Sequence, residues 1–451
     1  MALYITIFLH LLVMFSYHVG ELLAIQNFNP NSFKPVFNNS LSLSFPLTCL
    51  PLSRNSTFRA SLISTHQEST SSKSYSHGNF HFRSWFKYSM ALIVSLPIGT
   101  PPQTQQMVID TGSQLSWIQC HKKNPRKPHH KTLFVPSRSS SYSILPCNHP
   151  QCKPAIPDFT LPTSCDRTRH CHYSYFYADG TYAEGNLVRE KLTFSRYQST
   201  PPLILGCATK SRDAEGILGM NLGRFSLPYQ IRLSKFSYCV PFRQKLANVM
   251  PDGVFYLGQN PYSHTFRYVS ILTFAKSHLM PNFDPLAYTL KMVGIRIGGK
   301  KLDIASSAFL PNAGGAGQTM IDSGTEYTFL VDAAYTKVRQ EIVRLVGGKM
   351  KRGFVYENTL DMCFDGNALE IGRSIGDMVF EFDQGVEIMI EKERVLENVG
   401  GGVHCFGIGR SELLGATSNI IGNFHQQNLW VEFDLRSLKV GFGKADCSRS
   451  V

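Results

Sequence analysis

The chain has 451 residues, of which 43% are hydrophobic and 17% are charged, and its formal net charge is +13. This composition excludes a disordered or fibrous protein, and the length allows two or three domains. After the N-terminus no stretch reaches the ~18 uninterrupted apolar residues of a membrane helix, so we expect no membrane insertion of the mature chain.

The N-terminus has the pattern of a secretory signal peptide. The segment Met1–Ser16 is apolar, uncharged and short for a membrane span, and the small residue Ala24 ends a suitable cleavage site. We therefore expect residues 1–24 to be a signal peptide that takes the protein into the secretory pathway, first to the endoplasmic reticulum.

Residues 25–83 are rich in Ser, Asn, Thr and His, a composition that cannot bury much apolar surface. We expect this stretch to be disordered and interpret it as a pro-segment, with a solubilising linker as the open alternative. Both N-glycosylation sequons lie here, at Asn38 and Asn55. The segment contains several basic residues and a single acidic one, Glu68, a charge balance that would suit a segment covering an acidic cleft.

The 11 cysteines favour an oxidising compartment. Cys49 lies in the pro-segment, and the other ten allow five disulfides whose connectivity the residues themselves leave open. A zinc site is the less favoured interpretation of the cysteines and histidines between Cys147 and His172, because their spacings miss the usual C-x2-C pattern. We expect no metal and no cofactor.

Part of the positive charge is concentrated at residues 121–131, a segment broken by prolines. A nucleic-acid site would need aromatic side chains on which bases could stack, and this segment has none. We expect a solvated loop and no nucleic-acid partner.

From about Tyr88 the sequence consists of short alternating or β-branched runs separated by Gly, Pro, Asn and Asp clusters, which is typical of β-strands. One helix is clear at residues 331–346, where apolar residues recur at helical spacing between Asp332 and Gly347. The predicted fold class is therefore mostly β.

A weak internal repeat divides this β-rich part of the chain. An apolar run is followed by Asp-Thr-Gly-Ser at residues 110–113 and by Asp-Ser-Gly-Thr at residues 322–325. About 100 residues after each turn come two apolar residues and a glycine, at residues 217–219 and 420–422. The repeat predicts two similar β lobes, each of which gives one aspartate to the cleft between them.

Two carboxylates at close range cannot both ionise cheaply, so Asp110 and Asp322 would share one proton. The charged aspartate would take a proton from a water molecule, and the protonated one would polarise the carbonyl group of an amide. Gly112 and Gly324 would allow the tight turns, and Ser113 and Thr325 would hydrogen-bond the carboxylates. Thr111 and Ser323 would join the two lobes by hydrogen bonds.

Over about residues 85–447 these motifs resemble the pepsin-like aspartic proteases of family A1. Trp117 lies seven residues after Asp110, as in the first family motif, and residues 175–181 look like the family's flap hairpin. The resemblance implies that Tyr177 hydrogen-bonds Trp117 and that Asp179 and Gly180 form the flap tip. It implies a bilobal fold of two pseudo-symmetric β lobes with a central cleft, divided into residues 84–275 and 276–451.

The cysteine-rich stretch before the flap and the segment ending at Cys447 look like the plant nepenthesin/nucellin branch. Residues 99–103 resemble the subgroup that promotes cell survival. Family pairing implies four disulfides and leaves a fifth: Cys147–Cys171, Cys152–Cys165, Cys239–Cys447 and Cys363–Cys405, then Cys120–Cys207. We expect a monomer that acts on polypeptides and that ends in the extracellular space, the apoplast, or in a vacuole.

The flap departs from the common Tyr-Gly-Asp-Gly-Ser pattern at Ala178 and Thr181, and Ala178 would stiffen its tip. Every expected catalytic group is nevertheless present. The predicted function is therefore that of an aspartic endopeptidase made as a secretory zymogen. The alternative is a non-catalytic binding or inhibitor protein on the same fold, which would typically lack an aspartate or a flap element.

Overall fold

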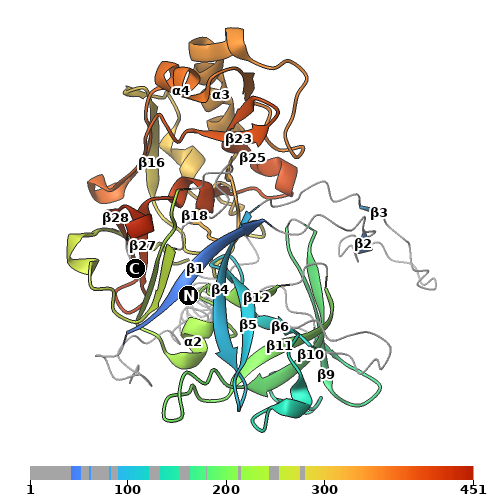
Figure 1. Ribbon diagram of the computed structural model, residues 1–451. Helices are drawn as coiled ribbons and strands as arrows, with labels where there is room; N and C mark the ends of the chain where they lie inside the picture. The colour runs from blue at the N-terminus through green and yellow to red at the C-terminus, as the bar shows by residue number, and fades with distance from the viewer. Residues whose placement is uncertain are drawn as a thin grey trace, which may run out of the picture.

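The computed structural model describes residues 42–51, 60–61, 81–82, 90–120, 133–152, 163–178, 180–211, 215–242, 253–274 and 280–449. The signal peptide, both sequons, most of the pro-segment, Asp179 and the basic loop lie outside the described residues. Within the described part, strands form most of the regular structure, which confirms the predicted mostly-β class (Figure 1).

The largest sheet among the described residues has fifteen strands and crosses the middle of the molecule. Its strands run in the order β15-β28-β27-β13-β14-β1-β4-β5-β12-β6-β11-β10-β9-β8, and β7 pairs with β10. Their bounds are β1 Leu43–Pro51, β4 Met90–Ile98, β5 Gln103–Asp110, β6 Trp117–Gln119, β7 Ser143–Ile144, β8 Thr163–Cys165, β9 Cys171–Phe176, β10 Tyr182–Glu190, β11 Leu203–Ser211, β12 Gly216–Gly219, β13 Lys235–Cys239, β14 Gly253–Leu257, β15 Arg267–Ser270, β27 Leu429–Asp434 and β28 Lys439–Lys444.

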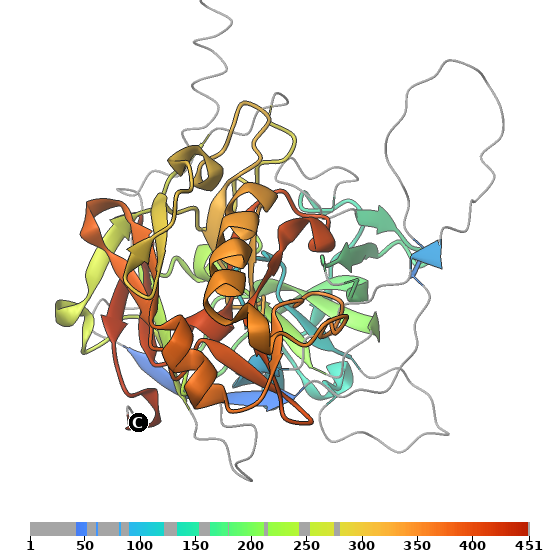
Figure 2. The ribbon, with the colours of Figure 1, turned by 90° about the horizontal axis from the view of Figure 1, so that it is seen from above.

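The remaining described strands form smaller sheets. Those of the C-terminal half are β16 Met292–Ile297, β17 Lys300–Lys301, β21 Met378–Phe382 and β22 Glu387–Ile390; β18 Thr319–Ile321, β19 Thr328–Leu330, β25 Ile408–Arg410 and β26 Asn419–Ile421; and β20 Cys363–Asp365, β23 Leu396–Gly400 and β24 Val403–Phe406. The pair β2 Ala60–Ser61 and β3 His81–Phe82 stands apart. Seen from above, the yellow-to-red C-terminal half lies nearest the viewer, with the green and cyan strands beside it (Figure 2).

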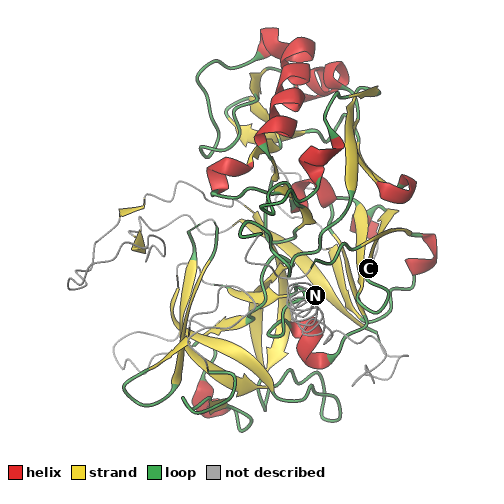
Figure 3. Cartoon of the chain, turned by 180° about the vertical axis from the view of Figure 1, so that it is seen from behind, coloured by secondary structure: helices red, strands yellow, loops and turns green. Residues whose placement is uncertain are grey.

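The α-helices are short apart from one. Among the described residues they are α2 Leu227–Ile231, α3 Asp332–Val346 and α4 Ala368–Ile375, and the last two lie together at one end of the molecule (Figures 1 and 3). Helix α3 confirms the prediction for residues 331–346, because Tyr335, Val338 and Ile342 face the core at helical spacing. No helix among the described residues is long and apolar enough to cross a membrane.

The two halves repeat one strand arrangement, as the sequence predicted. Strand β12 runs parallel to β5, with Gly219 beside Asp110, and also pairs with β6. Strand β26 runs parallel to β18, with Ile421 beside Ile321, and also pairs with β19. In each half the strand of the apolar-apolar-Gly element therefore lies between the strands on either side of an aspartate turn.

The expectation of disorder in residues 25–83 is wrong for Leu43–Pro51, which forms strand β1. This strand pairs antiparallel with both β14 and β4. Leu47 is fully buried, and the Phe45 ring packs against Phe194 and Phe255 at centroid distances of 5.9 and 6.3 Å. The composition of residues 25–83 as a whole is polar, but residues 43–47 alternate between apolar side chains and residues of the exposed face, as a β-strand does.

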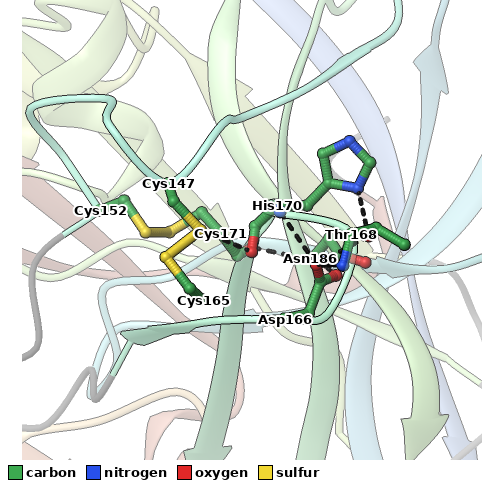
Figure 4. The surroundings of a disulfide bond; sticks show 8 residues. All are labelled: Cys147, Cys152, Cys165, Asp166, Thr168, His170, Cys171 and Asn186. Atoms are coloured by element: carbon green, nitrogen blue, oxygen red, sulfur yellow. Dashed lines mark hydrogen bonds between the residues drawn. A yellow bond between two sulfur atoms is a disulfide. The ribbon is translucent and has the colours of Figure 1, made fainter.

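Two of the expected disulfides are paired differently from the family-based prediction. Cys147 is joined to Cys165 and Cys152 to Cys171, whereas the other three pairs are those expected (Figure 4). Cys171 is fully buried, and Cys152 packs against the same apolar cluster. Cys165 lies exposed at the end of β8, where it meets Cys147. The bond on the buried side of this loop is therefore Cys152–Cys171, and the bond nearer the surface is Cys147–Cys165.

Candidate active site

The two aspartate turns face each other at the ends of their strands. Asp110 ends β5 and Asp322 follows β18, and the two residues are 7% and 8% exposed. Each glycine lies against the opposite carboxylate: a Cβ atom built on Gly112 would be 2.9 Å from Asp322 Oδ2, and one built on Gly324 would be 2.7 Å from Asp110 Cγ. Only glycine leaves room for the carboxylates to approach in this way.

Each carboxylate is held by the two residues that the sequence predicted. One oxygen accepts a hydrogen bond from a backbone N–H two residues later, and the other accepts one from a hydroxyl group three residues later. The distances are 2.9 and 2.5 Å in both turns, from Gly112 N and Ser113 Oγ to Asp110, and from Gly324 N and Thr325 Oγ1 to Asp322. Both side chains are thereby fixed in matching orientations.

The middle residues of the turns cross-link the two halves. Thr111 N donates to Ser323 Oγ at 3.1 Å, and Ser323 N donates to Thr111 Oγ1 at 2.9 Å. The Ser323 hydroxyl also donates to the carbonyl oxygen of Ile109 at 2.7 Å. Because these bonds are reciprocal and buried, the distance between the two aspartates is set by backbone and short side chains rather than by long flexible groups.

The electrostatics of the pair favour one retained proton. Burial raises the pKa of Asp322 above its ordinary value, and this outweighs hydrogen bonds from Thr325, Gly324 and Thr111 that act in the opposite direction. The Asp110 carboxyl group also acts to lower the pKa of Asp322, less strongly than burial raises it. A neutral Asp322 beside an ionised Asp110 avoids two buried like charges.

The flap hairpin lies where the resemblance placed it. Strands β9 and β10 form it, and Tyr177 N donates to Thr181 O at 3.0 Å while Gly180 N donates to Tyr177 O at 2.9 Å. Trp117 Nε1 donates to Tyr177 Oη at 2.7 Å, as expected. The hydroxyl end of Tyr177 is enclosed, and this burial, with nearby Tyr175 and Asp110, raises the pKa of Tyr177 well above its ordinary value.

Four residues that the sequence analysis did not single out hold the turns from below. Asn221 Nδ2 donates to Gly112 O at 3.5 Å, and Asn423 Nδ2 donates to Ser323 O at 2.9 Å. Both asparagines come just after the apolar-apolar-Gly elements, so the repeat contained a signal that could have found them. The other two residues are Gln426 and Tyr238, which lie beneath Asp322.

The base of the flap is braced by the loop that carries the paired disulfides. Hydrogen bonds from His170 N, from Thr168 N and Oγ1 and from Asn186 Nδ2 reach the Asp166 carboxylate (Figure 4). Desolvation alone would raise the pKa of Asp166, but these bonds outweigh it and lower the pKa. The four cysteines of the less favoured zinc interpretation all lie in disulfides, so they offer no thiolate ligands.

Comparisons with known proteins agree with this geometry. Residues 92–259 match the family model described as Xylanase inhibitor N-terminal, and residues 287–444 match Xylanase inhibitor C-terminal. The chain is 36% identical over 391 residues to aspartic proteinase PCS1 of Arabidopsis thaliana, which covers 81% of this chain and 84% of the relative. It is 31% identical over 364 residues to aspartic proteinase nepenthesin-1 of Nepenthes gracilis, over 79% of this chain and 78% of the relative. The chain belongs to the pepsin-like aspartic proteinases of plants, and specifically to the nepenthesin-like type.

Solved structures share the fold at lower sequence identity. The crystal structure of edgp matches with a TM-score of 0.61 at 17% identity and covers 92% of this chain and 96% of that chain. The crystal structure of basic 7S globulin from soybean matches with a TM-score of 0.57 at 18% identity, over 80% of this chain and 95% of that chain. These likenesses establish the fold alone.

Proposed function

We propose that the protein is an aspartic endopeptidase in which Asp110 and Asp322 together activate a water molecule. The observation that carries this proposal is the reciprocal fit of the two turns, in which each glycine lies against the opposite carboxylate. Two buried carboxylates held face to face are the arrangement that lets one residue type serve as both acid and base.

The reaction follows from the protonation state of the pair. The ionised Asp110 takes a proton from the water, whose oxygen then attacks the carbonyl carbon of the peptide bond. The protonated Asp322 donates a hydrogen bond to the carbonyl oxygen, on which negative charge develops. Return of the proton from Asp110 to the amide nitrogen breaks the C–N bond and releases an amine and a carboxylic acid.

The flap supplies the cover for this chemistry. Tyr177 stays protonated at every pH at which the dyad works, because its pKa is raised, and it accepts a hydrogen bond from Trp117. A hairpin fixed at this point can close over an extended polypeptide and exclude bulk water from the cleft. We propose that Asp179 and Gly180 belong to this closing tip.

A non-catalytic role on the same fold is the alternative. Such a protein would be expected to lack an aspartate, a supporting hydroxyl or the flap tyrosine, and this chain has Asp110, Asp322, Ser113, Thr325 and Tyr177. The relatives that cover most of the chain are named as aspartic proteinases, which also favours the enzyme.

We further propose a route of synthesis and a division into lobes. Residues 1–24 would be the signal peptide, Asn38 and Asn55 the glycan acceptors, and the extracellular space or a vacuole the destination of the monomeric protein. The lobes would be residues 84–275 and 276–451, although β27 and β28 of the second lobe join the large sheet. Strand β1 is excepted from the proposed pro-segment, because it belongs to that sheet.

Digestion of casein or haemoglobin between pH 3 and 7 tests the function. We expect acid-favoured cleavage that pepstatin blocks, since this compound occupies the cleft of pepsin-like enzymes. Cleavage that pepstatin leaves unchanged would contradict the proposal. No cleavage by protein from which the proposed pro-segment has been removed would contradict it as well.

A further inference from the structure

A buried chain of hydrogen bonds runs beneath Asp322 from the large sheet. Tyr238, on β13, donates from its hydroxyl group to Gln426 Oε1 at 2.5 Å. Gln426 Nε2 in turn donates to the carbonyl oxygens of Asp322 and Ile421, at 3.1 and 2.8 Å. Tyr238 and Gln426 are fully buried, so water does not compete for these bonds.

The two aspartate turns differ at this point, although the rest of the site is nearly symmetric. The carbonyl oxygen of Asp110 accepts a bond from the backbone N–H of Met220 at 2.9 Å, and Met220 directly follows Gly219. In the second half the residue after Gly422 is Asn423, whose N–H donates to Thr325 O at 2.8 Å. One residue, Met220, separates Gly219 from Asn221, whereas Asn423 follows Gly422 directly. The second half therefore has no counterpart of the Met220 N–H, and the Gln426 side chain supplies the hydrogen-bond donor to the Asp322 carbonyl oxygen.

Tyr238 also connects this donor to the cross-link between the halves. Burial raises the pKa of Tyr238 well above its ordinary value, and Ser323, whose own hydroxyl bonds to Ile109, acts in the opposite direction. A shift of the Tyr238 hydroxyl would therefore disturb both the carbonyl group of Asp322 and the residue that sets the spacing of the turns.

We propose that Tyr238 and Gln426 are positioning residues that fix the orientation of the Asp322 turn through its backbone carbonyl group. This inference rests on the proposed proteolytic function. The peptide carbonyl of Asp322 is rigidly joined to the turn whose Gly324 N–H and Thr325 hydroxyl hold the carboxyl group. Loss of the tie would let the turn rotate and admit water, which would lower the pKa of Asp322 toward its ordinary value.

Two single substitutions, Tyr238→Phe and Gln426→Met, test the hydrogen bonds that join Tyr238 to Gln426 and Gln426 to Asp322. Each substitution keeps the size of a fully buried side chain and removes its hydrogen bonds. We expect kcat to fall 10- to 100-fold with KM within twofold of the wild type. The limb of the kcat profile at higher pH, which reports loss of the shared proton, should move to lower pH. The double variant should lose little more than either single variant.

The control is Tyr335→Phe, which removes the hydroxyl of another buried tyrosine, one that donates to Asp361 and has no bond to either aspartate turn among the described residues. It should lower the melting temperature comparably and leave the pH profile unchanged. If Tyr238→Phe and Gln426→Met behave like this control, the tie is merely structural and the inference is overturned.

The titration of Asp322 separates this inference from the proposed function. The carboxyl pKa can be read by ¹³C NMR with no substrate present, so an inactive wild-type protein would count against the proteolytic function and still allow the comparison. We expect a lower pKa for Asp322 in both Tyr238→Phe and Gln426→Met, and an unchanged pKa for Asp322 in Tyr335→Phe. An unchanged pKa in folded Tyr238→Phe and Gln426→Met proteins would refute the positioning role.

Strand β1 carries a second and independent inference. It lies inside the large sheet, where Leu43 to Leu47 pair with Leu257 to Gly253 of β14, and Leu47 to Pro51 pair with Val94 to Met90 of β4. The two pairings overlap at Leu47, so β1 is the strand that joins β14 to β4. The Ser42 hydroxyl adds a bond to Gln259 O at 2.5 Å.

Loss of β1 would divide the sheet and leave unpaired strand edges on both sides of the gap. It would also uncover Leu92 and Val94, which are fully buried in β4. We infer that residues 43–51 stay in the mature protein, so that residues 25–83 are not removed as one pro-segment. A cut between residues 52 and 89 would then give two chains, with β1 held in place by its neighbours.

Two deletions in the full chain test this inference. Removal of residues 25–41 should leave the melting temperature and the yield of folded protein near those of the full chain. Removal of residues 25–83 should lower the melting temperature by more than 10 °C or prevent folding. Mass spectrometry of the gel-filtered mature protein should find the peptide that contains residues 43–51.

A matched variant guards against a trivial failure of the longer deletion. Leu47→Asp in the full chain places a charge at the fully buried centre of β1 and should reproduce the loss of stability. The inference is overturned if the protein without residues 25–83 is as stable as the full chain, or if the mature protein lacks residues 43–51.

Discussion

A methyl group added at Gly324 would enter the space through which Asp110 faces Asp322. Its carbon atom would lie 2.7 Å from Asp110 Cγ and 3.3 Å from Asp110 Cβ. Carbon atoms in contact are normally about 3.5–4.0 Å apart, so the carboxyl group would have to retreat by about 1 Å. A displacement of about 1 Å at a catalytic group can reduce the rate about 100-fold, or about 2.7 kcal/mol in the activation free energy.

The assay is kcat/KM on a fluorogenic peptide for Gly324→Ala, Gly112→Ala and the control Gly348→Ala. We expect about a 100-fold loss for Gly324→Ala and a smaller one for Gly112→Ala, whose added carbon would be 3.0 Å from Asp322 Cγ. Gly348 has no atom within 4 Å of such a carbon, so its variant should match the wild type. Wild-type activity in folded Gly324→Ala protein would show that the close approach of the two carboxyl groups does not limit the rate.

Three further predictions concern stability and the flap. Burial lowers the pKa of His425 from 6.5 to about 3, so the unfolded chain binds a proton below pH 6.5 that the folded chain does not bind until about pH 3. His425 should therefore lower the unfolding free energy increasingly as the pH falls through that range, by up to about 5 kcal/mol. In urea unfolding at pH 4 and pH 7, His425→Asn should reduce the difference in unfolding free energy between the two pH values. An unchanged difference would contradict this prediction. The Cys239–Cys447 disulfide spans 208 residues, and its removal should lower the unfolding free energy by about 2–5 kcal/mol, measured by urea unfolding against the oxidised wild type. Tyr177→Phe removes the acceptor of the Trp117 bond and should lower kcat/KM about 10-fold with an unchanged melting temperature; a wild-type rate would show that the bond does not matter.

The aspartate turns were predictable because their chemistry is local. The Gly and hydroxyl residues that hold each carboxylate lie within three positions of Asp110 or Asp322, and the repeat indicated that the two turns would meet. Helix α3 was predictable for a similar reason, since its apolar spacing is contained in one segment.

The parts that the sequence left undetermined depend on contacts between distant residues. Strand β1 is apolar over only a few alternating positions and is held by β14, about 200 residues away. Cys165 and Cys171 lie directly opposite each other on β8 and β9, so their order in the sequence does not decide which of them bonds to Cys147 and which to Cys152. Tyr238 and Gln426 are 188 positions apart, and neither resembles a catalytic residue on its own.

The most direct test of the catalytic pair is peptide cleavage by Asp110→Asn and by Asp322→Asn, each compared with the wild type at acid pH. Each substitution should lower kcat at least about 1,000-fold, because neither half can act as acid and base alone. Circular dichroism and the melting temperature should stay close to those of the wild type. Pepstatin-sensitive cleavage by either folded variant at a rate near that of the wild type would show that Asp110 and Asp322 are not the catalytic pair.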